Sequence, residues 1–150
     1  MVLLQTERLI IRDPKLEDAA GHHQVLSDEL TLYYWLSSSS SVQTTPVGKI
    51  VGAGYAILPE HRGQGYATEA FHALIRFAFE ENDVYRFVAG CRAENKASER
   101  MMQKCGMVKE AEFKCHTWHD GQMKDRVEYR LLKEEYQQKL KDKHSGGPYV

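Results

Sequence analysis

The stretch ILPEHRGQGYATEAF, residues 57–71, lies between an apolar segment and the most regular helical pattern in the chain. Pro59 cannot donate to a sheet ladder, so it ends the segment before it. Gly63 and Gly65 allow backbone conformations that turn successive N–H groups toward one point, just before a helix N-terminus with unpaired donors of its own. Together with Arg62, these amides predict a site for phosphate or pyrophosphate. The alternative is a plain strand-to-helix turn in which glycine is present only for steric reasons.

The rest of the chain predicts an α/β (α+β) fold with a mixed sheet, because strand-like and helix-like segments alternate. Asp120 and Gly121 predict a hairpin turn, and Gly106 a left-handed helix C-cap. Strands are expected over residues 6–12, 47–58, 85–93, 108–118 and 124–132, and helices over 14–26, 65–81 and 96–106. Five consecutive serines at 37–41 predict a loop.

Composition limits the class of protein. The chain has 150 residues, 42% hydrophobic and 27% charged, which suits one globular domain. The formal net charge of −1 supplies no electrostatic reason for a nucleic acid or an anionic membrane as partner. The first residues have no cationic segment before an apolar one, so we expect no signal peptide and a cytoplasmic protein. We expect the domain over 1–136, followed at 137–150 by the end of a helix and a flexible tail.

The cysteines do not indicate a metal site. Cys91, Cys105 and Cys115 are odd in number and have no C-x-x-C spacing, and the histidines are scattered. Reduced thiols and no bound metal are therefore expected.

The phosphate loop has neither of the common nucleotide-binding spacings. Gly63-x-Gly65-x-Ala67 lacks the third glycine of a dinucleotide fingerprint, and no Lys-Ser/Thr follows the last glycine as in a P-loop, which makes a nucleotide-binding regulatory domain the weaker alternative. Arg62-x-x-Gly65-x-Ala67 resembles instead the pyrophosphate signature of the GNAT N-acetyltransferase superfamily. The segments TERLIIRDPKLEDA, CRAENKASERMMQKCGM and HTWHDGQMKDRVEYRLL are similar to other parts of that family, over about residues 6–136.

The resemblance implies a GNAT-type mixed, mostly antiparallel sheet flanked by helices, and acetyl-CoA as co-substrate. Ile57 and Leu58 would lie on a splayed strand that pairs with the pantetheine arm, and the Leu58 amide would bind the oxyanion. Asn95 would bind the cofactor from the far side, and Ser98 would protonate the departing thiolate. The pyrophosphate would be held by the amides of Arg62, Gly63, Gln64, Gly65, Tyr66 and Ala67.

Simpler roles remain open for two of these residues, since Asn95 is a good N-cap by type and Ser98 is common near helix starts. Met102 stands where many family members carry a tyrosine acid, which leaves Ser98 as the hydroxyl candidate on this helix. No general base is assigned. Thr117 aligns with a glutamate of the nearest branch, and the neighbouring candidates are Glu112, His116 and His119.

The branch most similar to this chain acetylates the N-terminal alanine or serine of ribosomal proteins. A protein N-terminus is therefore the leading acceptor, followed by a small-molecule amine. Between residues 30 and 50 the chain is too short for the two family strands expected there, so strands are missing or merged. This shortening leaves open a homodimer that covers the gap, and a non-catalytic CoA-binding or interaction remnant as the alternative function.

Overall fold

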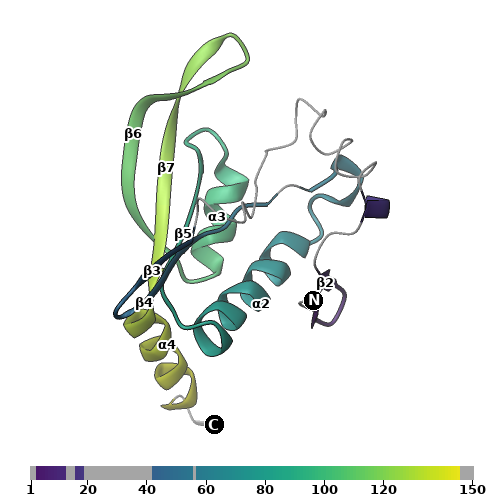
Figure 1. Ribbon diagram of the computed structural model, residues 1–150. Coiled ribbons are helices and arrows are strands. Elements are labelled where there is room, and N and C mark those ends of the chain that lie inside the picture. The colour runs from purple at the N-terminus through teal and green to yellow at the C-terminus, as the bar shows by residue number, and fades with distance from the viewer. Residues whose placement is uncertain (1–2, 13–15, 19–41, 56, 146–150) are drawn as a thin grey trace.

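The computed structural model describes residues 3–12, 16–18, 42–55 and 57–145 of the chain (Figure 1). Its main sheet has five strands in the order β3-β4-β5-β7-β6. Their bounds are β3 Val42–Thr45, β4 Gly48–Gly52, β5 Val84–Arg92, β6 Val108–His119 and β7 Gln122–Leu132. Three helices accompany the sheet: α2 Tyr66–Glu81, α3 Lys96–Lys104 and α4 Lys133–Ser145.

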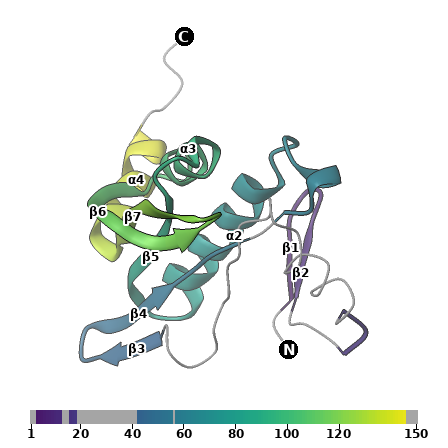
Figure 2. The same cartoon turned by 90° about the horizontal axis from the view of Figure 1, so that it is seen from above.

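The pairing within this sheet is mixed. β4 and β5 run parallel, whereas the pairs β3–β4, β5–β7 and β6–β7 are antiparallel. The prediction of a mixed, mostly antiparallel sheet flanked by helices is therefore confirmed. A separate antiparallel hairpin, β1 Leu3–Gln5 and β2 Ile10–Arg12, lies on the side of α2 away from β5 and β7 in both views (Figures 1 and 2).

The core lies between the sheet and its helices, and each element contributes the apolar positions that its periodicity predicts. Phe71 of α2 is 1% exposed and meets Phe87 of β5 edge-on, with 6.1 Å between ring centroids. Tyr136 of α4 stacks on Phe79 at 4.9 Å, which fixes α4 against the second half of α2. The buried set also includes Ile75, Ala78, Val84, Ala89, Cys91, Met101, Met102, Cys105, Val127, Tyr129 and Leu131.

Both predicted turn signals are confirmed. Asp120 and Gly121 have φ values of 51° and 75° between β6 and β7, the pair of positive angles that a type I′ turn requires. Gly106 follows α3 with φ of 82°, the left-handed conformation of a helix C-cap.

Two strand predictions were wrong in extent. Residues 6–9 form a turn instead of a strand, because the Thr6 hydroxyl accepts from the Leu9 amide at 3.0 Å and so supplies a local alternative to a ladder. The strand expected over 47–58 is β4, which ends at Gly52, and Val47 belongs to the turn before it. The stretch 57–58 therefore makes no sheet ladder.

Two further expectations fall mostly outside the described residues. Of the helix expected over 14–26, the described part is the single 3-10 turn η1, Leu16–Asp18. Within 30–50, the described part holds β3 and the beginning of β4, a hairpin with the register Thr45↔Gly48. In the described part of the chain, no helix is long and apolar enough to cross a membrane.

The environments of the three cysteines predict unequal reactivity. Burial raises the pKa of the Cys105 thiol to about 11, and burial also raises the pKa of Cys91, whereas Cys115 is exposed on β6. Because thiolate is the reactive form, we expect one thiol to react promptly with dithionitrobenzoate at pH 8 in the native protein, and three after unfolding. A Cys115→Ser variant should lose the prompt reaction, and prompt labelling of that variant would contradict the assigned burial.

Candidate active site

The sheet opens where β4 ends. The amide of Ala53 donates to the Val88 carbonyl oxygen at 2.8 Å, which is the last backbone bond between the two strands among the described residues. β5 continues to Arg92, where it still pairs with Arg126 of β7. The chain after Ala53 diverges from β5, and the N-terminal ends of α2 and α3 border the resulting gap.

A cleft of about 500 Å³ occupies this gap. Eight of the ten predicted site residues line it: Ile57, Arg62, Gly63, Gly65, Tyr66, Ala67, Asn95 and Ser98. Leu58 and Gln64 do not line it, although both lie in the same loop. Beyond these ten residues, the cleft is also lined by His61, which adjoins Arg62 in the loop, and by Tyr55, Thr68, Ala97, Arg100, Met101 and Lys104, which were not predicted.

The loop before α2 presents unpaired amides to the cleft. Gly63 and Gly65 adopt φ values of 73° and 81°, and Gly65 is the N-cap of α2. The first hydrogen bond of the helix runs from the Glu69 amide to the Gly65 carbonyl oxygen. The amides of residues 63–68 therefore have no acceptor within the described part of the chain, as expected for a helix start. The amide of Arg62 differs, because it donates to the Pro59 carbonyl oxygen at 3.3 Å.

Cationic side chains from the loop itself and from α3 line the cleft. Arg62 is anchored by its Nε, which donates to the Ile57 carbonyl oxygen at 2.8 Å. Arg100 and Lys104 line the cleft from α3, and neither has an ion-pair partner among the described residues. The sequence carried a signal for this pair that was not used: the spacing of four residues puts both on one face of the helix. Amides and cations together suit a pyrophosphate group.

A pair of hydroxyl groups lies at the other end of the cleft. Ser98 is 3% exposed, and its Oγ is 2.5 Å from the phenolic oxygen of Tyr55. Burial raises the pKa of Tyr55, an effect that the hydrogen bond with Ser98 partly opposes. Tyr55 therefore keeps its proton at neutral pH. Its ring is held by Phe71, edge-on at 5.3 Å. The sequence shows that Tyr55 is present, but only the fold shows that its hydroxyl contacts Ser98 of α3.

Asn95 acts as the N-cap of α3. Its Oδ1 accepts from the Ser98 amide at 3.1 Å, so the simpler role proposed for Asn95 is present alongside its place in the cleft. This bond fixes the first turn of α3, and with it the position of the Ser98 side chain.

Loss of the Asn95 cap should destabilise the protein measurably. We expect Asn95→Ala to lower the free energy of unfolding by about 1 kcal/mol, the usual cost of an N-cap truncation. Denaturant unfolding monitored by circular dichroism measures this difference. Asn95→Asp, which keeps the acceptor oxygen, is the matched control, and equal loss in both variants would rule out the capping account.

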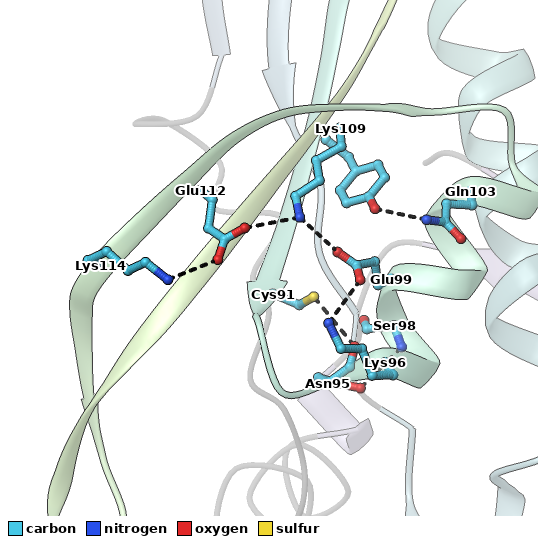
Figure 3. Close-up of polar contacts among 10 residues, drawn as sticks. Cys91, Asn95, Lys96, Ser98, Glu99, Gln103, Lys109, Glu112 and Lys114 are labelled. Carbon is cyan, nitrogen blue, oxygen red and sulfur yellow. Dashed lines mark hydrogen bonds and ion pairs between the residues drawn. The ribbon is translucent and has the colours of Figure 1, made fainter.

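A chain of charged side chains ties α3 to the hairpin formed by β6 and β7 (Figure 3). Glu99 meets Lys96 at 3.3 Å and Lys109 of β6 at 3.7 Å, and Lys109 also meets Glu112 at 3.2 Å. Gln103 adds a hydrogen bond to the Tyr129 hydroxyl at 3.0 Å. These contacts fix the position of α3, the helix that carries Ser98, relative to the sheet.

The candidates for a general base do not reach the cleft. Thr117, His116, His119 and Glu112 lie on β6 outside the cleft lining, and Glu112 is paired with Lys109 and Lys114. Met102 is 1% exposed in the core, so it offers no contact to a ligand. No Asp or Glu lines the described part of the cleft, and no group of three metal-binding side chains occurs among the described residues.

Comparison with known proteins agrees with this architecture. The family described as "Acetyltransferase (GNAT) domain" matches residues 38–108. The chain is 35% identical over 83 residues to the uncharacterized N-acetyltransferase YnaD of Bacillus subtilis, which is 55% of this chain and 49% of YnaD. It is 30% identical over 87 residues to the ribosomal-protein-serine acetyltransferase of Escherichia coli, again 55% of this chain and 49% of the relative.

The similarity extends further in three dimensions. A GNAT-family acetyltransferase from Bacillus anthracis superposes with a TM-score of 0.71 at 25% identity, over 89% of this chain and 99% of that one. Solved structures of this fold include complexes with CoA and with acetyl-CoA. Residues 38–108 thus match a GNAT acetyltransferase domain, and the fold of the described residues agrees with solved GNAT structures. The matched stretch spans about half the length of the two curated relatives.

Proposed function

We propose that this protein transfers an acetyl group from acetyl-CoA to a primary amine. The observation that carries the proposal is the layout of the cleft. Unpaired loop amides with Arg62, Arg100 and Lys104 lie at one end, and the hydroxyl pair of Ser98 and Tyr55 lies at the other. The first end suits the phosphates of a coenzyme, and the second suits a reacting thioester.

The residues around the hydroxyl pair supply what thioester aminolysis needs. The amine attacks the carbonyl carbon directly, and the carbon–sulfur bond breaks as the carbon–nitrogen bond forms. Ser98 donates its proton to the departing thiolate, and Tyr55, hydrogen-bonded to Ser98, replaces that proton. The attacking amine loses a proton to water, and water returns a proton to Tyr55, which balances the transfer. The Leu58 amide is our candidate donor to the oxyanion, and the Ile57 carbonyl is held by Arg62 beside it.

The acceptor we favour is a protein N-terminus, with a small-molecule amine second. The E. coli relative, named for ribosomal-protein serine, supports the first. We propose that the enzyme works in the cytoplasm, which the E. coli relative supports because its name gives a ribosomal protein as substrate. A homodimer remains the assembly that we would test first, because the described sheet ends in the short strand β3.

One observation favours the alternative, a non-catalytic CoA-binding domain. The described part of the cleft has no carboxylate, so no strong base faces the position of the amine. A domain that only binds CoA would need the loop amides and cations but not the hydroxyl pair.

Two measurements separate the candidates. Isothermal calorimetry with acetyl-CoA tests the binding site, and a thiol-release assay over a panel of N-terminal peptides and small amines tests transfer. Binding with release for one acceptor class supports the enzyme. Binding without release across the panel supports the binding domain, and absence of binding would exclude both.

A further inference from the structure

The turn between β1 and β2 makes a concentrated set of contacts with the first turn of α2. Glu69 is the focus of this set. Its Oε1 accepts from the Thr6 hydroxyl at 2.5 Å and from the Arg8 amide at 2.9 Å, and its Oε2 accepts from Arg8 Nε at 2.6 Å. The hydrogen bond from Thr6, followed by that from the Arg8 amide, lowers the pKa of Glu69. The carboxylate is therefore ionised and fully engaged at neutral pH.

Arg8 also reaches past Glu69 into the loop before the helix. Its Nη1 donates to the Gln64 carbonyl oxygen at 2.8 Å, and its guanidinium lies 4.8 Å from the centre of the Tyr66 ring. A Cβ added to Gly65 would lie 3.3 Å from Arg8 Nη2. One side chain thus contacts the loop on both sides of Gly65, the residue at which the loop becomes helix.

The bond to Gln64 has a directional consequence. In a trans peptide, the C=O of Gln64 and the N–H of Gly65 lie in one plane and point in opposite directions within it. Because Arg8 holds the carbonyl, the Gly65 N–H is aimed away from Arg8, and Gly65 lines the cleft while Arg8 and Gln64 do not. Without this bond, the flexible backbone at Gly65 would leave the peptide plane free to rotate.

We propose that Arg8 and Glu69 form a clamp that preorganises the anion-binding loop, with Arg8 acting through Gln64 and Tyr66 and without contacting the ligand. The proposal deepens the function proposed above, since it takes the ligand of the loop to be the pyrophosphate of CoA. The charge of Arg8 is neutralised by Glu69, so its role is to orient the Gly65 amide. Because the loop is ordered before the ligand binds, less conformational entropy is lost on binding.

The variants Arg8→Met and Glu69→Gln test the clamp. Met keeps an unbranched side chain but removes every side-chain donor of Arg8. Gln keeps the shape of Glu69 but removes its charge. We expect each to weaken CoA and dephospho-CoA binding about tenfold, the effect of losing one charge-assisted contact. Binding of pantetheine, which lacks the pyrophosphate, should be unchanged in NMR titrations. Arg8→Lys should restore part of the affinity, because it keeps a charged donor.

Hydrogen exchange without any ligand gives an independent measurement. We expect the amides of residues 69–72, the first hydrogen-bonded turn of α2, to exchange faster in Arg8→Met and Glu69→Gln than in the parent, with little change over residues 75–79. Arg86→Met is the matched control, because it breaks the exposed Arg86–Glu110 pair elsewhere in the molecule. It should alter neither CoA affinity nor exchange at residues 69–72.

The outcomes distinguish this proposal from the function on which it rests. Unchanged CoA affinity in both variants, or an equal loss of pantetheine and CoA binding, would overturn the clamp while leaving CoA binding intact. A parent protein that does not bind CoA would overturn the proposed function. In that case faster exchange at residues 69–72 still supports the ordering role of the clamp, and unchanged exchange overturns it.

Discussion

Gly65→Asp is expected to lower the affinity for CoA by about a hundredfold or more, since a hydrogen bond to a charged group contributes roughly 1.5–3 kcal/mol and the new carboxylate also repels the phosphates. Gly65 is the N-cap of α2 with φ of 81°, and its amide is one of the unpaired donors of the loop. The added side chain would also press on Arg8, whose Nη2 lies 3.3 Å from the position of a Cβ. Calorimetric titration with CoA measures the effect.

The matched control for this variant is Gly121→Asp. Gly121 has a similar φ of 75°, and a Cβ there would meet nothing within 4 Å. It lies in the turn between β6 and β7, outside the cleft lining. We expect it to cost some stability because of its backbone conformation but no CoA affinity. Tight CoA binding by Gly65→Asp would show that the phosphates bind elsewhere.

Ser98→Ala is expected to lower kcat by a factor of roughly 10²–10⁴, the range for removal of a positioned proton donor. The hydroxyl is buried, and its Oγ is hydrogen-bonded with the Tyr55 hydroxyl. Alanine still allows Asn95 to cap the helix, because the cap bond uses the Ser98 amide. The affinity for acetyl-CoA should therefore stay near that of the parent, which calorimetry checks beside the thiol-release rate.

Tyr55→Phe separates the roles of the two hydroxyl groups. If Ser98 protonates the sulfur and Tyr55 only supplies its proton, Tyr55→Phe should cost less in kcat than Ser98→Ala. The ring of phenylalanine keeps the packing on Phe71, so the protein should remain folded. A larger loss in Tyr55→Phe than in Ser98→Ala would identify Tyr55 as the direct donor and contradict the assignment made here.

Local chemistry explains why most helices and turns were predictable. α2 and α3 each begin and end with a signal that acts over a few residues, such as Gly65 and Asn95 at the starts and Gly106 after α3. The turn at Asp120 and Gly121 is likewise a property of two residues and their backbone angles. These features depend on nearest neighbours, so a single sequence is enough to find them.

The ends of strands and the contacts between distant residues were harder to predict from the sequence. The composition of residues 47–58 predicts one strand because its side chains suit a sheet. A strand continues only while it pairs with a neighbour, and β5 pairs with this segment only as far as Gly52 and Ala53. The turn at residues 6–9 has a strand-like composition. Besides the local hydrogen bond between Thr6 and Leu9, it is held by contacts of Thr6 and Arg8 with Glu69, some 60 residues away.

The sequence by itself therefore determined the conformation of the loop, from which we predict phosphate binding, because glycine conformations and helix-start amides are local properties of residues 62–67. It also determined the mixed sheet and the resemblance to GNAT acetyltransferases. Only the tertiary structure decided which groups share the cleft. It placed Tyr55 against Ser98, turned Arg100 and Lys104 toward the loop, and set Arg8 behind Gly65. Those pairings join residues that are far apart in the chain, and their geometry follows from packing on the sheet.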